Sequence, residues 1–551
     1  MERLPIGIQS FRKIIEGGCL YIDKTRFVYD LASTDGAYFL SRPSRFGKSL
    51  LLDTFQELFS GPPGRDGDPR GLFAGLWIGS SDFDFTRKFP VVTLSMAAGT
   101  ESLDVLKASL TEQLNFINLR ENLNLDLTFP ASALPMIIET LSLKHKTRVV
   151  VLIDEYDAPV SSNLADPKLA VAFGNFLKSF YVSLKDLDKH LRFVFVIGVT
   201  RYALTWLSAG FNQLTDLTLA DRFSEICGFA PQELDRYFGG LMPSVLDTMK
   251  TEGRLPKDAG LAELRKLIMD WYGGYSWDGA KKVLNPWSVL NFFDKARFSG
   301  YWAETCNLSY LLSFLTDYGD KDPLVLAKDN FELIPKRAIL SADIAKPETV
   351  PALFHTGYLT VDKAEDLMYR GVFYTLKKPN QEVQNRTLAF FSESMFSILK
   401  MKPEAESYDF SMAVREKDAG RLTDVFSSLF AGLDPSHHQP TESFYYALVY
   451  AYCSKLGRLA LSEPLGSKGT PDLALLFQTP SSCVCAVIGL KFDRGETAKD
   501  KRKLVSRLAD DALKAIETKD YWRPYKAHAE LLVKIGIGVT YRGECLVKTA
   551  D

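Results

Sequence analysis

The residues best suited to chemistry lie near the start of the chain, in the run Phe46-Gly47-Lys48-Ser49. An apolar stretch, residues 37–40, precedes this run, and a segment with apolar residues at helical spacing follows it. A loop between a strand and a helix offers backbone N–H groups and the positive end of a helix dipole to phosphate oxygens. We expect Lys48 to reach the β- and γ-phosphates of a nucleotide and the Ser49 hydroxyl to ligate Mg²⁺. The run therefore predicts a phosphate-binding P-loop.

This loop departs from the usual P-loop pattern at one position. The pattern has a glycine five residues before Gly47, and this chain has Arg42 there. The tripeptide Gly-Lys-Ser alone also fits an ordinary helix start with an exposed lysine, so a second element has to decide between the two interpretations. The loop residues predicted to contact a nucleotide are Arg42, Pro43, Ser44, Arg45, Phe46, Gly47, Lys48 and Ser49.

The second element is a pair of carboxylates further along the chain. Residues 149–153 are consecutive aliphatic residues, which is typical of a parallel strand buried on both faces. Asp154 and Glu155 follow directly, where such a strand ends. We expect Asp154 to hold Mg²⁺ and Glu155 to orient or deprotonate the attacking water. A strand that ends in a polar turn is the simpler alternative, but loop and carboxylates together predict ATP binding.

A third apolar strand, residues 193–199, ends in Thr200 and Arg201. In additional-strand ATPases the strand beside the acidic one ends in a polar residue that senses the γ-phosphate. Thr200 fits this role, and Arg201 fits a charge sensor or arginine finger. The alternative for Arg201 is a solvated strand end.

Length and composition limit the class of protein. A chain of 551 residues is long enough for about two to four domains. Its formal net charge of −2 gives no general attraction to nucleic acid or anionic membranes. No apolar run approaches the ~20 residues that span a bilayer, and the N-terminus lacks the pattern of a signal peptide. The scattered cysteines show no zinc spacing, so the sequence predicts reduced thiols in a cytoplasmic protein without a membrane partner.

The order of predicted elements suggests four regions. Strands alternate with helices over residues 1–225, which predicts an α/β fold with a parallel sheet and ligands at the carboxyl ends of its strands. Residues 226–300 are helical and aromatic, which fits a helical lid over the nucleotide or, alternatively, a plain aromatic core. Residues 301–435 are expected to form a helical, winged-helix-like middle region, on the basis of a helix, turn and strand within 353–360. Residues 436–551 form the predicted C-terminal domain.

The loop also makes the chain resemble a known family. The run Arg42-Pro43-Ser44-Arg45-Phe46-Gly47-Lys48-Ser49 is similar to the P-loop of the AAA-ATPase-like proteins that carry a C-terminal PD-(D/E)XK nuclease-like domain. In that family the loop reads Arg-Pro-x-Arg-Phe-Gly-Lys-Ser/Thr, so Arg42 is the family's own variant. The resemblance implies an ATPase module tied to a nuclease fold. Further matching stretches are Leu4-Pro5-Ile6-Gly7, Tyr21-Ile22-Asp23-Lys24-Thr25, Asp154-Glu155-Tyr156-Asp157, Asn285-Pro286-Trp287-Ser288, Thr356-Gly357-Tyr358-Leu359 and Pro379-Asn380-Gln381-Glu382-Val383.

The implied nuclease motif is incomplete. Such a site uses acidic ligands for Mg²⁺ and a lysine that stabilises developing charge. Asp472 and Lys491 match the motif as catalytic residues, with Asp472 also a metal ligand, but the glutamate expected two residues before the lysine is Gly489. The C-terminal domain is therefore expected to be catalytically degenerate. The alternative is an active nuclease in which Glu442 or Glu463 supplies the missing carboxylate from another position in the chain.

The sequence thus predicts an ATP-binding and ATP-hydrolysing enzyme with ATP and Mg²⁺ as cofactors. Its nucleotide state is expected to control a nuclease-like, DNA-interacting domain, and the chain is expected to form a homo-oligomer. The alternative is a nucleotide-dependent switch or scaffold that binds a protein partner and has no nuclease activity. The predicted catalytic residues are Glu155, Thr200, Arg201, Asp472 and Lys491, and the predicted metal ligands are Ser49, Asp154 and Asp472.

Overall fold

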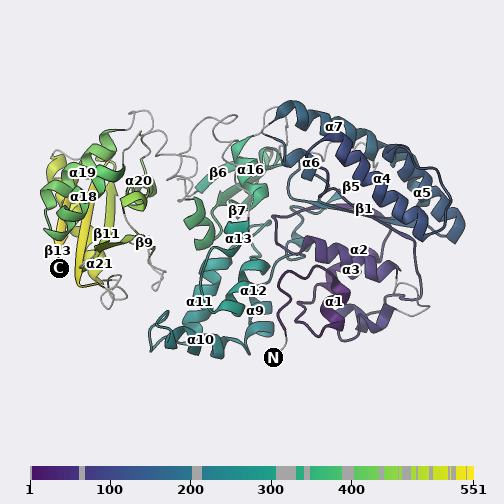
Figure 1. Cartoon of the computed structure of the whole chain (residues 1–551), viewed down its shortest axis with the longest axis horizontal. Helices are drawn as coiled ribbons and strands as arrows, with labels where there is room; N and C mark the ends of the chain where they lie inside the picture. The colour runs from purple at the N-terminus through teal and green to yellow at the C-terminus, as the bar shows by residue number, and fades with distance from the viewer. Residues whose placement is uncertain are drawn as a thin grey trace. The chain divides into compact units, whose positions relative to one another are not determined.

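A computed structural model of the chain divides it into two compact units (Figure 1). The first unit ends at Val383 and the second begins at Gln384. Within the described residues, no helix has both the length and the apolar content that crossing a membrane requires. The structure describes residues 3–60, 69–164, 166–201, 214–305, 330–340, 348–387, 403–432, 438, 440–456, 458–461, 473–479, 482–495, 500–518, 522, 529–541 and 543–550.

The first unit is built around a five-stranded sheet in the order β2-β3-β4-β1-β5. Every neighbouring pair is parallel, and β4 lies between β1 and β3. The predicted parallel α/β sheet is therefore confirmed. Its strands are β1 (Gly36–Ser41), β2 (Val91–Ser95), β3 (Val149–Asp154), β4 (Leu191–Gly198) and β5 (Leu214–Asp216).

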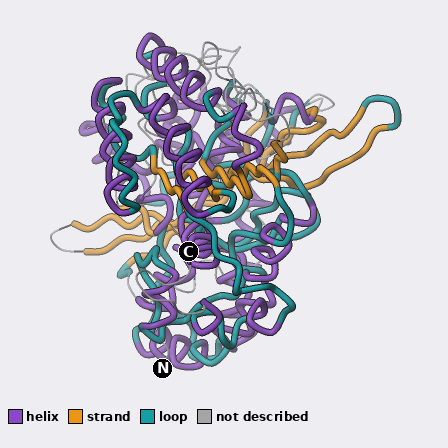
Figure 2. Tube along the Cα trace, turned by 90° about the vertical axis from the view of Figure 1, so that its right-hand side faces the viewer, coloured by secondary structure: helices purple, strands orange, loops and turns teal. Residues whose placement is uncertain are grey.

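Helices cover both faces of this sheet (Figures 1 and 2). On one face, Phe55 packs against Phe193 and Phe195 with ring centroids 5.0 Å apart. On the other face, Val151 and Ile153 belong to a core that includes residues of α4, α5 and α7. Because both faces are buried, the strands read as continuous apolar runs. The helices of this part are α1 (Phe11–Glu16), α2 (Thr25–Ala32), α3 (Lys48–Ser60), α4 (Leu103–Arg120), α5 (Pro130–His145), α6 (Ala158–Ser161) and α7 (Pro167–Val182).

The rest of the first unit is a helical region followed by a small antiparallel sheet in the order β6-β8-β7. The predicted helix, turn and strand within 353–360 is confirmed, because α16 ends at Thr356, Gly357 has a φ of 93° and β7 begins at Thr360. The winged-helix likeness stays a prediction. The elements are α9 (Pro231–Phe238), α10 (Met242–Thr251), α11 (Leu261–Tyr272), α12 (Pro286–Lys295), α13 (Tyr301–Thr305), β6 (Asn330–Pro335), α15 (Lys336–Ile339), α16 (Thr349–Thr356), β7 (Thr360–Leu367) and β8 (Gly371–Lys377).

The second unit contains a mixed sheet in the order β13-β12-β11-β10-β9. Strands β11 and β12 are parallel, and α21 forms the crossover between them; the other neighbours are antiparallel. Cys485 and Val487 pack with Ile516 of α21 in its core. The elements are α18 (Pro403–Arg415), α19 (Ala419–Ala431), α20 (Glu442–Leu456), β9 (Arg458–Leu461), β10 (Leu473–Thr479), β11 (Ser482–Asp493), α21 (Lys501–Thr518), β12 (Leu531–Thr540) and β13 (Cys545–Ala550).

The division into two units differs from the four predicted regions. The C-terminal unit begins well before residue 436, because residues ahead of that position hold its sheet edge. The N–H of Val547 in β13 donates to the Thr423 hydroxyl at 2.9 Å, and the Thr549 hydroxyl donates to the carbonyl of Lys417 at 3.0 Å. Both acceptors lie in or next to α19, so this helix belongs to the second unit.

Candidate nucleotide site

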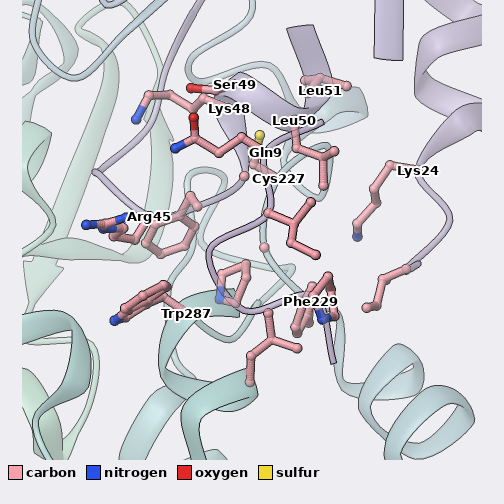
Figure 3. A pocket seen from close by; sticks show the side chains of 18 of the residues that line it. Gln9, Lys24, Arg45, Lys48, Ser49, Leu50, Leu51, Cys227, Phe229 and Trp287 are labelled. Carbon is pink, nitrogen blue, oxygen red and sulfur yellow. The ribbon is translucent and has the colours of Figure 1, made fainter. Parts of the chain in front are cut away.

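A cavity of about 490 Å³ opens at the carboxyl ends of β1, β3 and β4 (Figure 3). Its volume is within the range of small-molecule sites, and ligands of parallel α/β sheets bind at this edge. Residues 44–51 form one wall, while Glu155 and Val199 come from the ends of β3 and β4. The other walls are formed by Pro5, Gly7, Ile8, Gln9, Ile14, Leu20, Tyr21, Ile22, Lys24, Ile226, Cys227, Gly228, Phe229, Pro286, Trp287, Leu290 and Thr305.

Two residues in the left-handed region shape the loop. Gly47 has a φ of 89° and Arg45 a φ of 65°. Glycine adopts this conformation readily, whereas for a residue with a Cβ atom the conformation costs roughly 1–2 kcal/mol of steric energy. The chain then enters α3, where the N–H of Leu51 donates to the carbonyl of Gly47 at 3.0 Å.

Lys48 is buried near the carboxylates of Asp154 and Glu155 at the end of β3. Its ammonium donates to the carbonyl of Pro43 at 2.9 Å. Burial lowers the pKa of Lys48, and the negative charges of Asp154 and Glu155 act in the opposite direction. Lys48 and Asp154 therefore lie at the same edge of the sheet, within electrostatic reach of each other.

Glu155 lines the cavity with a strained backbone, since its φ is 48°. Its N–H donates to the carboxylate of Asp154 at 2.8 Å. Partial burial raises the pKa of Glu155, and the neighbouring Asp154 raises it further. A more basic carboxylate is better suited to accept a proton from water near neutral pH.

Thr200 is held by Asp157, a residue for which the sequence predicts no role. Its N–H donates to the Asp157 carboxylate at 2.6 Å, and its hydroxyl donates to the same oxygen. The N–H of Val199 donates to the other oxygen at 3.1 Å. A Cβ atom on Gly198 would lie 2.3 Å from Asp157, so only glycine fits there. Thr200 thus lies next to a cavity residue with its hydroxyl already engaged.

Arg201 does not line the cavity. It is buried, forms an ion pair with Asp216 at the end of β5, and its guanidinium lies 5.7 Å from the ring centroid of Phe39. Burial acts to raise the pKa of Asp216, but Arg201 and the N–H of Thr218 outweigh it, so the pKa is lowered. Arg201 is thus held in an ion pair with Asp216 here, and its role as a charge sensor or arginine finger stays a prediction.

Arg42 is also buried and outside the cavity lining, contrary to its predicted nucleotide contact. Its guanidinium donates to the carbonyls of Ser41, Thr218 and Phe223 at 2.8–3.1 Å. It also stacks on Trp277, 3.9 Å from the ring centroid. Burial lowers the pKa of Arg42 to about 10. An arginine replaces the usual glycine because its side chain joins the loop to neighbouring segments instead of facing a nucleotide.

Other loop residues are fixed by the helical region. Phe46 packs edge-to-face on Tyr275 with ring centroids 4.8 Å apart. The indole N–H of Trp302 donates to the carbonyl of Ser44 at 3.1 Å. Pro43, outside the cavity lining, offers its carbonyl to Lys48. The position of the helical region is therefore coupled to the conformation of the loop.

The sequence missed the residues that hold these groups in place. Asp157 and Trp287 lie inside stretches that match the family. That match is the signal that could have identified them, but it indicates no particular role for either residue. Asp216 and Trp302 lie outside those stretches and carry no local signal. Their function depends on contacts between segments far apart in the chain.

The second unit brings Lys491 together with Glu442. The Lys491 ammonium lies 3.1 Å from one Glu442 oxygen, and the N–H of Phe492 donates to the other at 3.3 Å. Asp472 and Glu463 lie outside the described residues. One of the two alternative carboxylates, Glu442, is thus beside the motif lysine.

Gly489 faces α21. A Cβ atom at this position would lie 3.1 Å from the Ile516 side chain and 3.2 Å from the carbonyl of Ala512. These contacts are tighter than ordinary van der Waals distances, so a glutamate side chain has little room there.

The sheet order, with β4 inserted between the loop strand and the acidic strand, defines a P-loop NTPase-like domain. A family model described as a predicted AAA-ATPase matches residues 5–208. The chain is also similar to a protein of Azotobacter chroococcum mcd 1, described as an uncharacterized protein in the vnfD 5' region. The two are 31% identical over 556 residues, which cover 97% of this chain and 96% of the relative. Residues 5–208 are therefore an AAA-ATPase-like domain, and the whole chain belongs to one family with the Azotobacter protein. The resemblance is confirmed for its ATPase-like part.

Proposed function

We propose that this chain binds ATP and hydrolyses it at the cavity described above. The observation that carries the proposal is that Lys48 and Glu155 line one cavity at the carboxyl edge of the sheet, with Asp154 at the end of β3 bonded to the N–H of Glu155. The family model for a predicted AAA-ATPase supports it. On nucleotide binding, Lys48 exchanges the carbonyl of Pro43 for phosphate oxygens.

The donor set also fits Mg²⁺, which prefers oxygen ligands. The Ser49 hydroxyl and the Asp154 carboxylate supply such oxygens at the same edge. Bound Mg²⁺ offsets the negative charge of the phosphates. Glu155 then orients the attacking water and accepts its proton, and Thr200, fixed by Asp157, borders the γ-phosphate.

Phosphate release from the purified full chain tests hydrolysis. We expect Glu155→Gln to retain ATP binding and to lower the turnover rate by roughly 100-fold or more, the usual contribution of a general base. Glu139→Gln, at an exposed position on α5, is the matched control and should leave the rate unchanged. Equal rates for the native chain and Glu155→Gln would contradict the proposal.

For the second unit we propose a nuclease-like, DNA-interacting domain that is catalytically degenerate and controlled by the nucleotide state. Two observations support this: the motif lysine is paired with Glu442, and Gly489 packs against α21 where the motif has a carboxylate. The second candidate is a nucleotide-dependent switch or scaffold for a protein partner. A homo-oligomer is proposed for either, to be tested by sedimentation with and without ATP.

Plasmid DNA with Mg²⁺ and ATP separates these functions. Retarded but uncut plasmid supports the degenerate domain. Cleavage that Asp472→Ala abolishes would show an active nuclease instead. Absence of both retardation and cleavage would favour the scaffold.

A further inference from the structure

Three arginines lie in or near the loop, and their guanidinium groups differ in their bonding partners. Arg42 is enclosed by backbone carbonyls, and Arg201 is paired with Asp216. Arg45 is exposed, lines the cavity, and forms no ion pair with any described carboxylate. Arg45 can therefore turn towards a ligand without breaking an ion pair, as Arg201 would, or a set of buried hydrogen bonds, as Arg42 would.

Arg45 is also close to the reacting part of the proposed site. Its positive charge acts on Glu155, and both side chains line the same cavity. In Figure 3 the Arg45 guanidinium and the Lys48 ammonium extend to the same side of the loop. The guanidinium lies 4.6 Å from the ring centroid of Trp287, at the start of α12. Such a contact at an exposed site is weak, about 0.5–1 kcal/mol, so the side chain can leave the ring.

We propose that Arg45 is the catalytic arginine of this site, supplied by the P-loop of the same chain. The inference rests on the proposed ATPase function. The water oxygen bonds to the γ-phosphorus, the bond from that phosphorus to the bridging oxygen breaks, and its electron pair stays with ADP. The proton of the water passes to Glu155. Arg45 stabilises the charge on the γ-phosphoryl oxygens and the bridging oxygen, and Trp287 holds its guanidinium when no triphosphate is bound.

The other cations of the site are less suited to this role. Arg201 would have to leave Asp216, which lies in a partly buried environment. Lys24 lines the cavity, but its ammonium contacts both oxygens of Glu233 at 2.6 and 2.8 Å. Lys48 is expected to be occupied by the β- and γ-phosphates in the ground state and the transition state alike.

The backbone of Arg45 offers a clean variant. Because its φ of 65° favours glycine, Arg45→Gly removes the guanidinium and keeps the loop conformation. Arg45→Lys keeps the charge without the planar guanidinium fork. Arg236→Ala is the matched control, since Arg236 is exposed and stacks on Tyr237, with its guanidinium 5.2 Å from the ring centroid, away from the cavity lining.

The experiment compares turnover with binding of ADP and of ADP with aluminium fluoride, a transition-state mimic, in the full chain. We expect Arg45→Gly to lower turnover by roughly 1,000-fold, at the low end for arginine fingers. We expect it to bind ATP and ADP as the native chain does and to lose the extra affinity for the mimic. Arg45→Lys should recover part of the turnover and part of the extra affinity for the mimic, and Arg236→Ala should match the native chain in both quantities.

Native turnover and native affinity for the mimic in Arg45→Gly would overturn the inference. So would their loss in Arg201→Lys with Arg45→Gly unaffected, since Arg201 would then be the catalytic arginine. Failure of the ATPase proposal looks different: the native chain and Glu155→Gln would release phosphate at the same background rate.

Discussion

Each unit of this protein places a lysine and a glutamate near the end of a strand, but in different electrostatic states. In the first unit Lys48 is 7% exposed and bonds a backbone carbonyl, while Asp154 and Glu155 form no ion pair with it. In the second unit Lys491 and Glu442, 34% and 31% exposed, neutralise each other.

The difference shows how a binding site can be distinguished from a structural pair. Charges kept apart in a buried cavity are costly, and the lowered pKa of Lys48 and the raised pKa of Glu155 reflect that cost. A ligand that brings opposite charges into the cavity lowers this cost. An ion pair that is already formed offers a ligand less, because the ligand must first displace one partner.

The largest expected effect concerns Asp157, which supports the first of these two regions. Asp157→Ala leaves the N–H groups of Val199 and Thr200 and the Thr200 hydroxyl without their acceptor. We expect the unfolding free energy of the first unit to fall by roughly 3 kcal/mol or more, at about 1–3 kcal/mol per unsatisfied group. Denaturant unfolding followed by tryptophan fluorescence measures it. Asp104→Ala, at an exposed position of α4, is the control; equal stabilities of the two variants would refute the role of Asp157.

The next effect concerns Glu382, a buried carboxylate that contrasts with the paired Glu442. It accepts from the Ser288 hydroxyl at 2.8 Å and the N–H of Trp302 at 2.7 Å. Burial raises its pKa from 4.5 to about 8. Between these values the folded chain holds a proton that the unfolded chain has released, so the stability that is full below pH 4.5 is lost as the pH rises through 8.

Thermal unfolding of the full chain between pH 5 and 9, compared with Glu382→Gln, measures this dependence. We expect the native first unit to lose stability over this range and the variant to be flatter. Parallel profiles would show that Glu382 titrates normally.

A smaller effect is expected at Gly489, which lies in β11 of the second unit. Gly489→Glu places a side chain against Ile516, and we expect it to lower the unfolding free energy of the second unit by roughly 1–3 kcal/mol, as overpacking does. Gly71→Glu, at an open surface position of the first unit, is the control. If Gly489→Glu keeps native stability and cuts DNA, the unit has room for the missing ligand.

The smallest effect is expected for the partly exposed pair of Lys491 and Glu442. Glu442→Gln should lower the unfolding free energy by at most about 1 kcal/mol, because solvent screens an ion pair that it can reach. If it raised affinity for DNA at low salt, measured by fluorescence anisotropy, the freed Lys491 would be identified as a phosphate contact. A loss of several kcal/mol would show that the pair is structural.

The features of the fold and the site that follow from sequence are those with a local cause. The aliphatic run before Asp154 predicted β3, and the parallel sheet then required its carboxylates and the loop to meet at one edge. The unit boundary was not predictable in this way, because the contact of Val547 with Thr423 joins distant segments. The positions of Arg42 and Arg201 also depend on partners that are distant in the chain. Sequence alone does not reveal these partners, and it therefore predicted that both arginines face the nucleotide.

Calorimetric titration of ATP with Mg²⁺ into the full chain and into Lys48→Ala tests directly whether the cavity binds ATP. We expect saturable binding to the native chain and a roughly 100-fold or greater loss of affinity in the variant, which loses one or two charge-assisted hydrogen bonds. Lys107→Ala, on the exposed face of α4, should bind as the native chain does. Equal affinities of Lys48→Ala and the native chain for ATP would show that Lys48 does not bind the phosphates and that the cavity is not the ATP site.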